Sequence, residues 1–179
     1  MPDLIVDRFV EIDFAGVGRP FLILDVDNTI APIDPRAGLV AGVAEHLHAA
    51  RITGALRDVC LVSNVFAGAR KRRRVEAFAA ALDAHFVLPG ILHLKPHPAP
   101  FLEALRHMGA TAAETVVVGD QLFTDVRGGK RLDMLTVYVR PIGPDHWTTG
   151  LTLRRFRERR LLRRFESLIS DSSGAPAVE

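Results

Sequence analysis

The stretch FLILDVDNTI, residues 21–30, decides the fold expected for this chain of 179 residues. Four apolar residues in a row are typical of a strand that is buried on both faces. The run ends in two carboxylates, Asp25 and Asp27, which repel each other when they lie close together. A binding site at the end of the strand explains this pattern, because ligands of parallel sheets lie beyond the carboxyl ends of the strands.

Four more short apolar runs share this β-rich composition, and segments with helical spacing separate them. The five predicted strands span residues 21–26, 59–62, 86–88, 115–118 and 135–139. The predicted helices span about 37–50, 67–82, 100–108 and 125–132. Strands that alternate with helices predict an α/β fold in which helices cover both faces of a parallel sheet.

The length of the chain suits a single domain, which we place at residues 1–169, with residues 170–179 as a disordered tail. Because 48% of the residues are hydrophobic, a sizeable core is expected. Cys60 is the one cysteine, which excludes an internal disulfide and fits a reducing compartment. It lies in the apolar run DVCLV and is interpreted as a small buried hydrophobe.

The location expected from the sequence is the cytoplasm. No apolar run reaches the ~18 residues of a membrane span. The first residues, MPDLIVDRFVEIDF, are acidic where a signal peptide would be basic. A net charge of +2 gives no global signature of a nucleic-acid-binding protein.

The predicted strands are followed by polar residues that together suit one chemical site. They are Asp25, Asp27 and Thr29 after the first strand, Ser63 and Asn64 after the second, Lys95 after the third, and Asp120 and Asp125 after the fourth. Because the carboxyl ends of parallel strands meet at one edge, we expect these side chains to lie together. Each motif alone is typical of a turn or a helix cap, but their order at successive strand ends favours a site.

Carboxylates without a histidine or thiolate partner suit a hard cation such as Mg²⁺. Mg²⁺ would offset the charges of Asp25 and Asp120 and could also bind a phosphate oxygen. Asp25 is then the expected nucleophile on phosphorus, which gives an aspartyl-phosphate. Asp27 lies two residues further along the strand, points the same way, and is the expected general acid and base.

The remaining polar residues are expected to hold the phosphate. Ser63 and Asn64 would donate hydrogen bonds to the phosphoryl oxygens, and Lys95 would act as a point charge on them. Thr29 is expected to support the site. His97 stands between two prolines and is interpreted as structural.

The motifs DVDNT, SN, KP and GDQLFTD resemble the four ordered motifs of the haloacid dehalogenase (HAD) superfamily. The resemblance implies a Rossmann-like, doubly wound core and a required Mg²⁺. It implies that the metal is held by Asp25, by the backbone carbonyl of Asp27 and by Asp120. It also implies that Asp125 supports the metal-bound waters or Lys95. Aspartate at both positions of the first motif is the form found in phosphatases and phosphotransferases.

The segments 119–142 and 145–162 resemble the YqeG-type branch of HAD subfamily IIIA. This branch is similar to the mitochondrial phosphatidylglycerophosphatase, and the resemblance covers roughly residues 20–165. It implies that the substrate is phosphatidylglycerophosphate, which is converted to phosphatidylglycerol.

The spacing of the motifs leaves no room for a separate cap domain, because one helix and its loops fill the chain from Asp25 to Ser63 and again from Asn64 to Lys95. An open site suits a phosphate carried on a large molecule.

Three alternatives stay open. The first is a phosphatase for a soluble sugar phosphate, a nucleotide or a nucleic-acid end. The second is a phosphoaccepting receiver domain, which would need its acceptor aspartate after the middle strand, where Ser63 and Asn64 stand. The third is a non-catalytic membrane-binding module. The oligomeric state is not fixed by the sequence.

A basic amphipathic helix is expected over about residues 151–169. Seven arginines lie between Arg154 and Arg164. Four of them, Arg159, Arg160, Arg163 and Arg164, lie opposite an apolar face that includes Leu161 and Leu162. The arginines either face solvent above a helix packed on the core or contact an anionic membrane. Nucleic acid is disfavoured, because no aromatic residues interleave the arginines. The run RKRRR, residues 70–74, is interpreted as a solvated helix face, with an extension of the same basic surface as the alternative.

Overall fold

The computed structural model describes residues 1–64, 69–143, 156–158 and 160–164. The chain divides into two compact units, one of them Pro2–Pro144 and the other Asp145–Glu179 together with Met1. In the second unit, residues 156–158 and 160–164 are helical. The rest of the helix predicted for 151–169, and the tail predicted for 170–179, lie outside the described residues. The assignment of residues 1–169 to one domain therefore stays a prediction.

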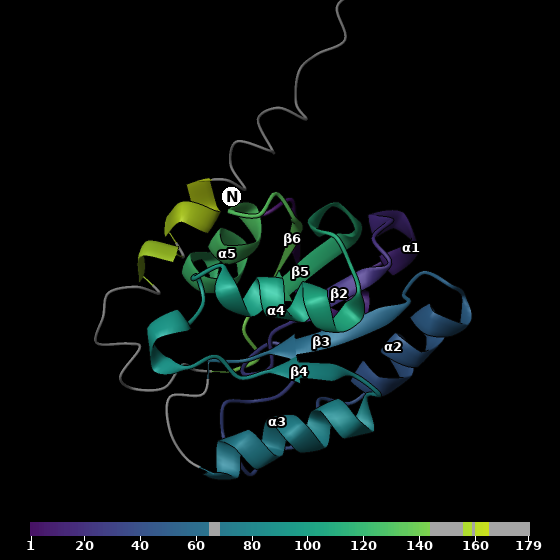
Figure 1. Ribbon diagram of the computed structural model, residues 1–179. Coiled ribbons are helices and arrows are strands. Elements are labelled where there is room, and N and C mark those ends of the chain that lie inside the picture. Colours follow the sequence, from purple (N-terminus) through teal and green to yellow (C-terminus); the bar gives the residue numbers. More distant parts are fainter. Residues whose placement is uncertain (65–68, 144–155, 159, 165–179) are drawn as a thin grey trace, which may run out of the picture. The chain divides into compact units, whose positions relative to one another are not determined.

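Unit Pro2–Pro144 is built on one six-stranded sheet in which every neighbouring pair of strands is parallel. The order of the strands is β1-β6-β5-β2-β3-β4, and Figure 1 shows β2, β3, β5 and β6 side by side. The strands are β1 (Leu4–Val6), β2 (Phe21–Leu24), β3 (Asp58–Val62), β4 (His85–Val87), β5 (Thr115–Gly119) and β6 (Leu135–Val139). Because all of them run the same way, their carboxyl ends form a single edge.

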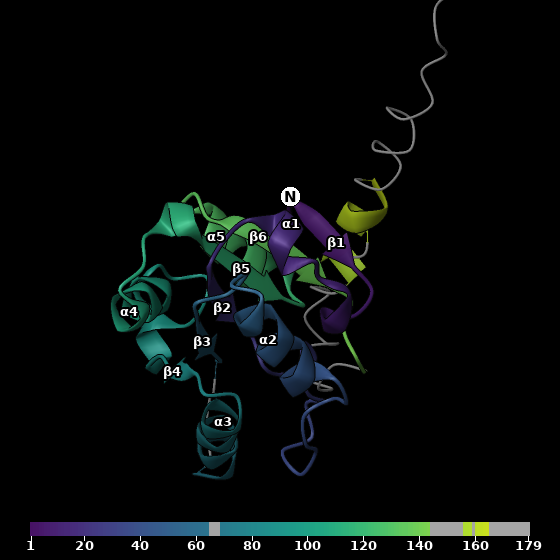
Figure 2. The ribbon, with the colours of Figure 1, turned by 90° about the vertical axis from the view of Figure 1, so that its right-hand side faces the viewer.

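Helices cover both faces of this sheet. The α-helices are α1 (Phe14–Val17), α2 (Val43–Ile52), α3 (Ala69–Ala81), α4 (Ala99–Met108) and α5 (Arg127–Lys130). Short 3₁₀ helices form at η1 (Phe9–Glu11), η2 (Ile91–His93) and η3 (Ala112–Glu114), and a π-helical turn forms at η4 (Leu122–Val126). Figure 2 shows α4 on one side of the sheet and α2 on the other.

The central strand β2 contributes to a separate core on each face. Leu22 and Leu24 pack in the cluster that includes residues of α2 and α3, whereas Ile23 packs in the cluster that includes residues of α4. Alternate side chains of a strand point to opposite faces, so a strand buried on both faces must be apolar throughout. The unbroken run of residues 21–24 therefore has a direct structural cause.

The predicted α/β fold is confirmed, and the differences are local. Strand β1 was not among the predicted strands, although residues 4–6 are an apolar run as long as β4. Helix α2 begins at Val43 rather than near residue 37, after Gly42, whose φ of +85° ends the preceding loop. Cys60 is buried, as expected. His97 accepts a hydrogen bond from the backbone N–H of Ala99, so it has a structural contact at the start of α4.

The chain from β2 to β4 forms no separate cap in the residues that the structure describes. Helix α2 with its loops connects β2 to β3, and helix α3 connects β3 to β4. Among the same described residues, no helix is both long enough and apolar enough to cross a membrane.

Candidate active site

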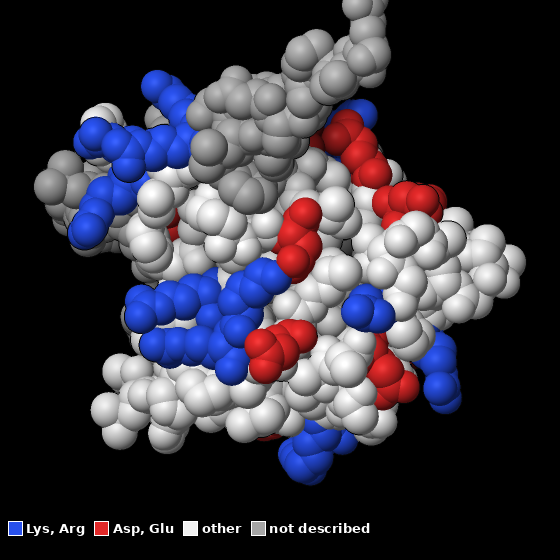
Figure 3. Space-filling view, turned by 90° about the horizontal axis from the view of Figure 1, so that it is seen from above, with Lys and Arg blue, Asp and Glu red and all other residues white. Residues whose placement is uncertain are grey.

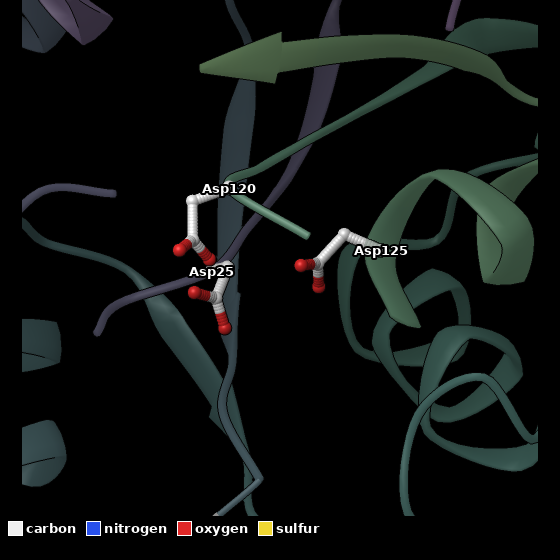
Figure 4. Close-up of side chains that lie close together, drawn as sticks. All are labelled: Asp25, Asp120 and Asp125. Atoms are coloured by element: carbon white, nitrogen blue, oxygen red, sulfur yellow. The ribbon is translucent and has the colours of Figure 1, made fainter. Parts of the chain in front are cut away.

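Three buried carboxylates meet at the carboxyl edge of the sheet. Asp25 directly follows β2, Asp120 directly follows β5, and Asp125 lies in η4. Each offers an oxygen, and these oxygens all lie within 4.8 Å of one another. Figure 4 shows the carboxylates of Asp25 and Asp120 close together, with that of Asp125 pointing toward them from the neighbouring turn. Strands β2 and β5 are paired neighbours, which brings two of these residues together although 95 positions separate them in the sequence.

The Lys95 ammonium joins two of these carboxylates. Its Nζ lies 2.5 Å from Oδ1 of Asp25 and 2.7 Å from Oδ1 of Asp125. A third hydrogen bond, 2.6 Å long, goes to the backbone carbonyl of Val62 at the end of β3. The lysine is itself buried. Each of the three N–H donors of its ammonium has an acceptor in the protein.

Burial and charge act in opposite directions on the ionisation of this cluster. Burial raises the pKa of Asp25 above its ordinary value, and the charge of Lys95 only partly offsets that effect. Burial alone would lower the pKa of Lys95, but the charges of Asp125 and Asp25 outweigh burial and raise it. Lys95 is therefore cationic at neutral pH, whereas Asp25 retains a tendency to hold a proton.

The donor set fits a hard divalent cation. Asp25, Asp120 and Asp125 supply only oxygen atoms, and their three carboxylates carry more negative charge than one lysine offsets. Thr29 Oγ1 donates a 3.2 Å hydrogen bond to Oδ2 of Asp25, the oxygen that Lys95 does not contact. The residues therefore suit Mg²⁺ better than a metal that prefers nitrogen or sulfur ligands.

Asp125 can approach the end of β5 because residue 119 is glycine. A Cβ atom built on Gly119 would lie 2.4 Å from Cγ of Asp125, which is closer than any real contact. The hydroxyl of Thr124 also donates to Oδ2 of Asp125, at 3.1 Å. Gly119 is a site residue that sequence analysis missed, although it stands directly before Asp120 in the motif GDQLFTD.

Asp27 has a different setting from Asp25. Strand β2 ends at Leu24, so the two aspartates lie beyond the strand, and the strand alternation does not explain how Asp27 points. Its carboxylate accepts a 2.7 Å hydrogen bond from Nη1 of Arg74 and lies 3.8 Å from Nζ of Lys71. It is still near enough to Asp25 for its charge to raise the pKa of that residue.

Arg74 was interpreted from the sequence as part of a solvated helix face, and this interpretation is wrong. Its side chain is only 6% exposed. Besides Asp27, the guanidinium donates to the backbone carbonyls of Pro32 at 2.6 Å and Ala37 at 3.2 Å, and it lies over the ring of Phe78. One arginine therefore ties helix α3 to Asp27 and to the loop that follows it.

Asn64 and Lys95 hold their two loops together. Oδ1 of Asn64 accepts from the backbone N–H of Lys95 at 2.9 Å, and Nδ2 donates to the Lys95 carbonyl at 3.2 Å. Ser63 is buried at the end of β3, next to Asn64. The structure thus gives Asn64 a positioning contact, and the expected contacts of Ser63 and Asn64 with a phosphate stay predictions.

A cavity of about 330 Å³ opens on the same edge of the sheet, beside Thr29. Its walls are mostly apolar and come from the ends of β1 and β6 and from the start of α2. The lining residues include Phe9, Val40, Val43, Val139, Arg140 and Ile142. Because Thr29 also contacts Asp25, the cavity adjoins the carboxylate cluster.

Comparisons with known proteins agree with this geometry. Residues 94–141, which include Lys95, Asp120 and Asp125, match the family described as HAD-hydrolase-like. The chain is 33% identical over 121 residues to "Probable phosphatase YqeG" of Bacillus subtilis, an alignment that covers 68% of this chain and 64% of that protein. It is 29% identical over 165 residues to the chloroplastic "Phosphatidylglycerophosphate phosphatase 1" of Chlamydomonas reinhardtii, covering 87% and 58% respectively.

A solved structure of a putative HAD-like phosphatase from Mesorhizobium loti has the same fold, with a TM-score of 0.51 and 20% identity over 78% of this chain and 76% of that one. The resemblance to the HAD superfamily that the four motifs indicated is confirmed. The chain spans about three fifths of the length of the two curated relatives.

We expect Mg²⁺ at millimolar concentration to raise the melting temperature by about 5 °C, because a ligand that binds only the folded state stabilises it. Asp120→Asn should abolish this rise, since it removes one charged oxygen donor. Asp83→Asn is the matched control: Asp83 is exposed and has a positive φ, which asparagine tolerates. Because the pKa of Asp25 is raised, protons compete with the metal, so the rise should be larger at mildly alkaline than at mildly acidic pH. Scanning fluorimetry measures the melting temperature. An equal rise in Asp120→Asn would exclude a metal site at this carboxylate cluster.

We expect Arg74→Gln to lower the free energy of unfolding by about 2 kcal/mol, because it leaves a partly buried carboxylate and two carbonyls without their donor. It should also lower kcat more than it raises KM, since Asp27 loses the group that orients it. Arg72→Gln is the control, because Arg72 is exposed and pairs with Glu76 one turn further along α3. Urea unfolding and steady-state kinetics would reject this role for Arg74 if the two variants behave alike.

Proposed function

With the HAD-like relationship as the premise, we propose that this protein is a Mg²⁺-dependent phosphomonoester hydrolase that works through an aspartyl-phosphate on Asp25. The observation that carries the proposal is the buried cluster in which Lys95 joins Asp25 to Asp125, with an Asp120 oxygen within 4.8 Å of theirs. We propose phosphatidylglycerophosphate as the substrate, supported by the named activity of the Chlamydomonas relative and by the absence of a separate cap between β2 and β4 in the described residues.

Each residue has a proposed part in the first half of the reaction. A carboxylate oxygen of Asp25 attacks phosphorus and forms the acyl phosphate, while the bond from phosphorus to the glycerol oxygen breaks. Asp27 gives its proton to that oxygen, so the leaving group departs as a neutral alcohol. Lys95 neutralises charge on the phosphoryl oxygens, and Ser63 and Asn64 donate hydrogen bonds to them.

The second half regenerates the enzyme. Asp27, now a carboxylate, takes a proton from water, which attacks phosphorus and releases Asp25 and inorganic phosphate. Asp25, Asp120 and the backbone carbonyl of Asp27 are the proposed ligands of Mg²⁺, which when bound neutralises charge on the phosphoryl group. Asp125 and Thr29 keep Lys95 and Asp25 in place, as their contacts indicate.

The contact between Arg74 and Asp27 bears on the proton transfer. Nη1 of Arg74 occupies Oδ1 of Asp27 at 2.7 Å. Proton transfer therefore uses the other carboxylate oxygen, or follows a movement of the carboxylate toward the leaving oxygen when substrate binds.

Two further proposals concern the surroundings of the site. The apolar cavity beside Thr29 is a suitable place for the part of the substrate next to the phosphate, since pockets of roughly 300–1,000 Å³ hold small ligands. The arginine-rich C-terminal segment is proposed to contact an anionic membrane, which would place a cytoplasmic protein at the surface that carries its substrate.

We expect phosphate release to require Mg²⁺ and to disappear in Asp25→Asn, because the amide is not a nucleophile. Asp27→Asn should still bind Mg²⁺ but turn over roughly 10²–10⁴ times more slowly, the usual contribution of a general acid or base. Both effects are measured by phosphate release, with Asp83→Asn as the control. Full activity in Asp25→Asn would contradict the mechanism.

The substrate is tested by comparing phosphatidylglycerophosphate in mixed micelles with a panel of soluble sugar phosphates, nucleotides and a 5′-phosphorylated oligonucleotide. We expect the highest kcat/KM for the lipid. A higher value for any soluble compound would replace the lipid with that class, while leaving the proposed chemistry intact.

A further inference from the structure

Two large apolar side chains project into solvent just before Lys95. Ile91 is 75% exposed and Leu92 is 88% exposed, the highest values among the large hydrophobic residues that the structure describes. Single exposed apolar residues are common, but two adjacent ones call for a reason. The backbone around them is ordered, because His93 N–H donates to the Gly90 carbonyl at 2.9 Å and His97 N–H donates to the Leu94 carbonyl at 2.9 Å.

Basic residues lie at the start of α3. Arg70, Lys71, Arg72 and Arg73 occupy its first turns, and no acidic residue is present in the first turn. The amino end of a helix carries partial positive charge, so cations there reduce helix stability. Figure 3 shows another face, on which several Lys and Arg side chains gather with Asp and Glu at their border. The cluster on α3 differs because its charges lie near the amino end of a helix, where they reduce helix stability, and this cost favours a role for them.

The apolar pair and the basic cluster lie on the edge of the sheet that carries the active site. Ile91 and Leu92 follow the carboxyl end of β4, and α3 begins shortly after the carboxyl end of β3, which pairs with β4 in parallel. In Figure 1, η2 and the first turn of α3 both lie at the left, where the arrowhead of β3 points. Leu92 is only three residues before Lys95.

We propose that Ile91, Leu92, Arg70 and Arg73 form a docking surface for an anionic lipid bilayer. Exposed aliphatic side chains beside cationic ones are the combination that binds the interfacial region of such a membrane. None of these four side chains is aromatic, so they offer bases no ring on which to stack, and nucleic acid is the alternative that the test includes. Docking here brings Lys95 and Asp25 toward the lipid headgroups. The docking surface deepens the proposed function and rests on it, because it would bring the active site to a lipid substrate. Vesicle binding can nevertheless be measured without turnover.

The test is co-sedimentation of the full chain with vesicles of phosphatidylcholine alone or mixed with phosphatidylglycerol. We expect binding to the mixed vesicles and little to phosphatidylcholine. Arg70→Gln/Arg73→Gln should weaken that binding about thirtyfold, as expected for two cations near a charged surface. Ile91→Ser/Leu92→Ser should weaken it by a similar factor, because the inserted apolar area is lost.

Matched controls lie at the opposite edge of the sheet. Ile52 ends α2, is 73% exposed and precedes β3, so Ile52→Ser removes similar apolar area elsewhere. Arg19→Gln/Arg106→Gln removes the same charge near the starts of β2 and β5. Circular dichroism shows whether every variant is folded, independently of any phosphatase activity.

The possible results separate the docking surface from the activity. Selective loss of vesicle binding in the two test variants supports the surface, even if no phosphatase activity is found. Absence of binding, equal loss in the controls, or unchanged binding in the test variants would overturn it. Tight binding to a single-stranded oligonucleotide but not to vesicles would overturn it in favour of nucleic acid.

Discussion

The ion-pair cluster around Lys95 is the interaction on which the carboxyl edge of the sheet depends. Three carboxylates within 4.8 Å of one another, all buried, would repel strongly without a cation, because a buried and uncompensated charge costs several kcal/mol. The ammonium of Lys95 bridges two of them and also binds the end of β3. The cluster thereby connects β2, β3 and η4 with the loop that follows β4, and it still carries excess negative charge that a divalent metal would balance.

The two aspartates of the first motif have different environments, and this difference is the basis for giving them different roles. Asp25 is buried beside like charges, so its pKa is raised, and binding of a cation favours the ionised form needed for attack. Asp27 is partly exposed and is held by Arg74, which reaches it from α3. The pair formed by Asp27 and Arg74 does not include Lys95. We propose that it holds the group that transfers the proton.

The sequence allowed the strands around the site to be predicted, because apolar runs buried on both faces leave an unambiguous pattern. It also allowed Asp25, Asp120, Asp125 and Lys95 to be placed at one edge, since parallel strands share that edge. The sequence did not allow the contact between Arg74 and Asp27 to be predicted. One arginine in the run RKRRR looks like the others, and only the packing of α3 against Asp27 distinguishes it. The alternation of a strand was also applied to Asp27, although the strand had already ended.

The most direct measurement is the trapping of a phosphorylated residue. Protein turning over a phosphomonoester with Mg²⁺ is quenched, the acyl phosphate is reduced with borohydride, and peptides are sequenced by mass spectrometry. We expect the reduced side chain at Asp25 alone, and only when both substrate and Mg²⁺ are present. Modification at Asp27 or at another residue, or none in a sample that releases phosphate, would contradict the central claim that the carboxylate held by Lys95 receives the phosphoryl group.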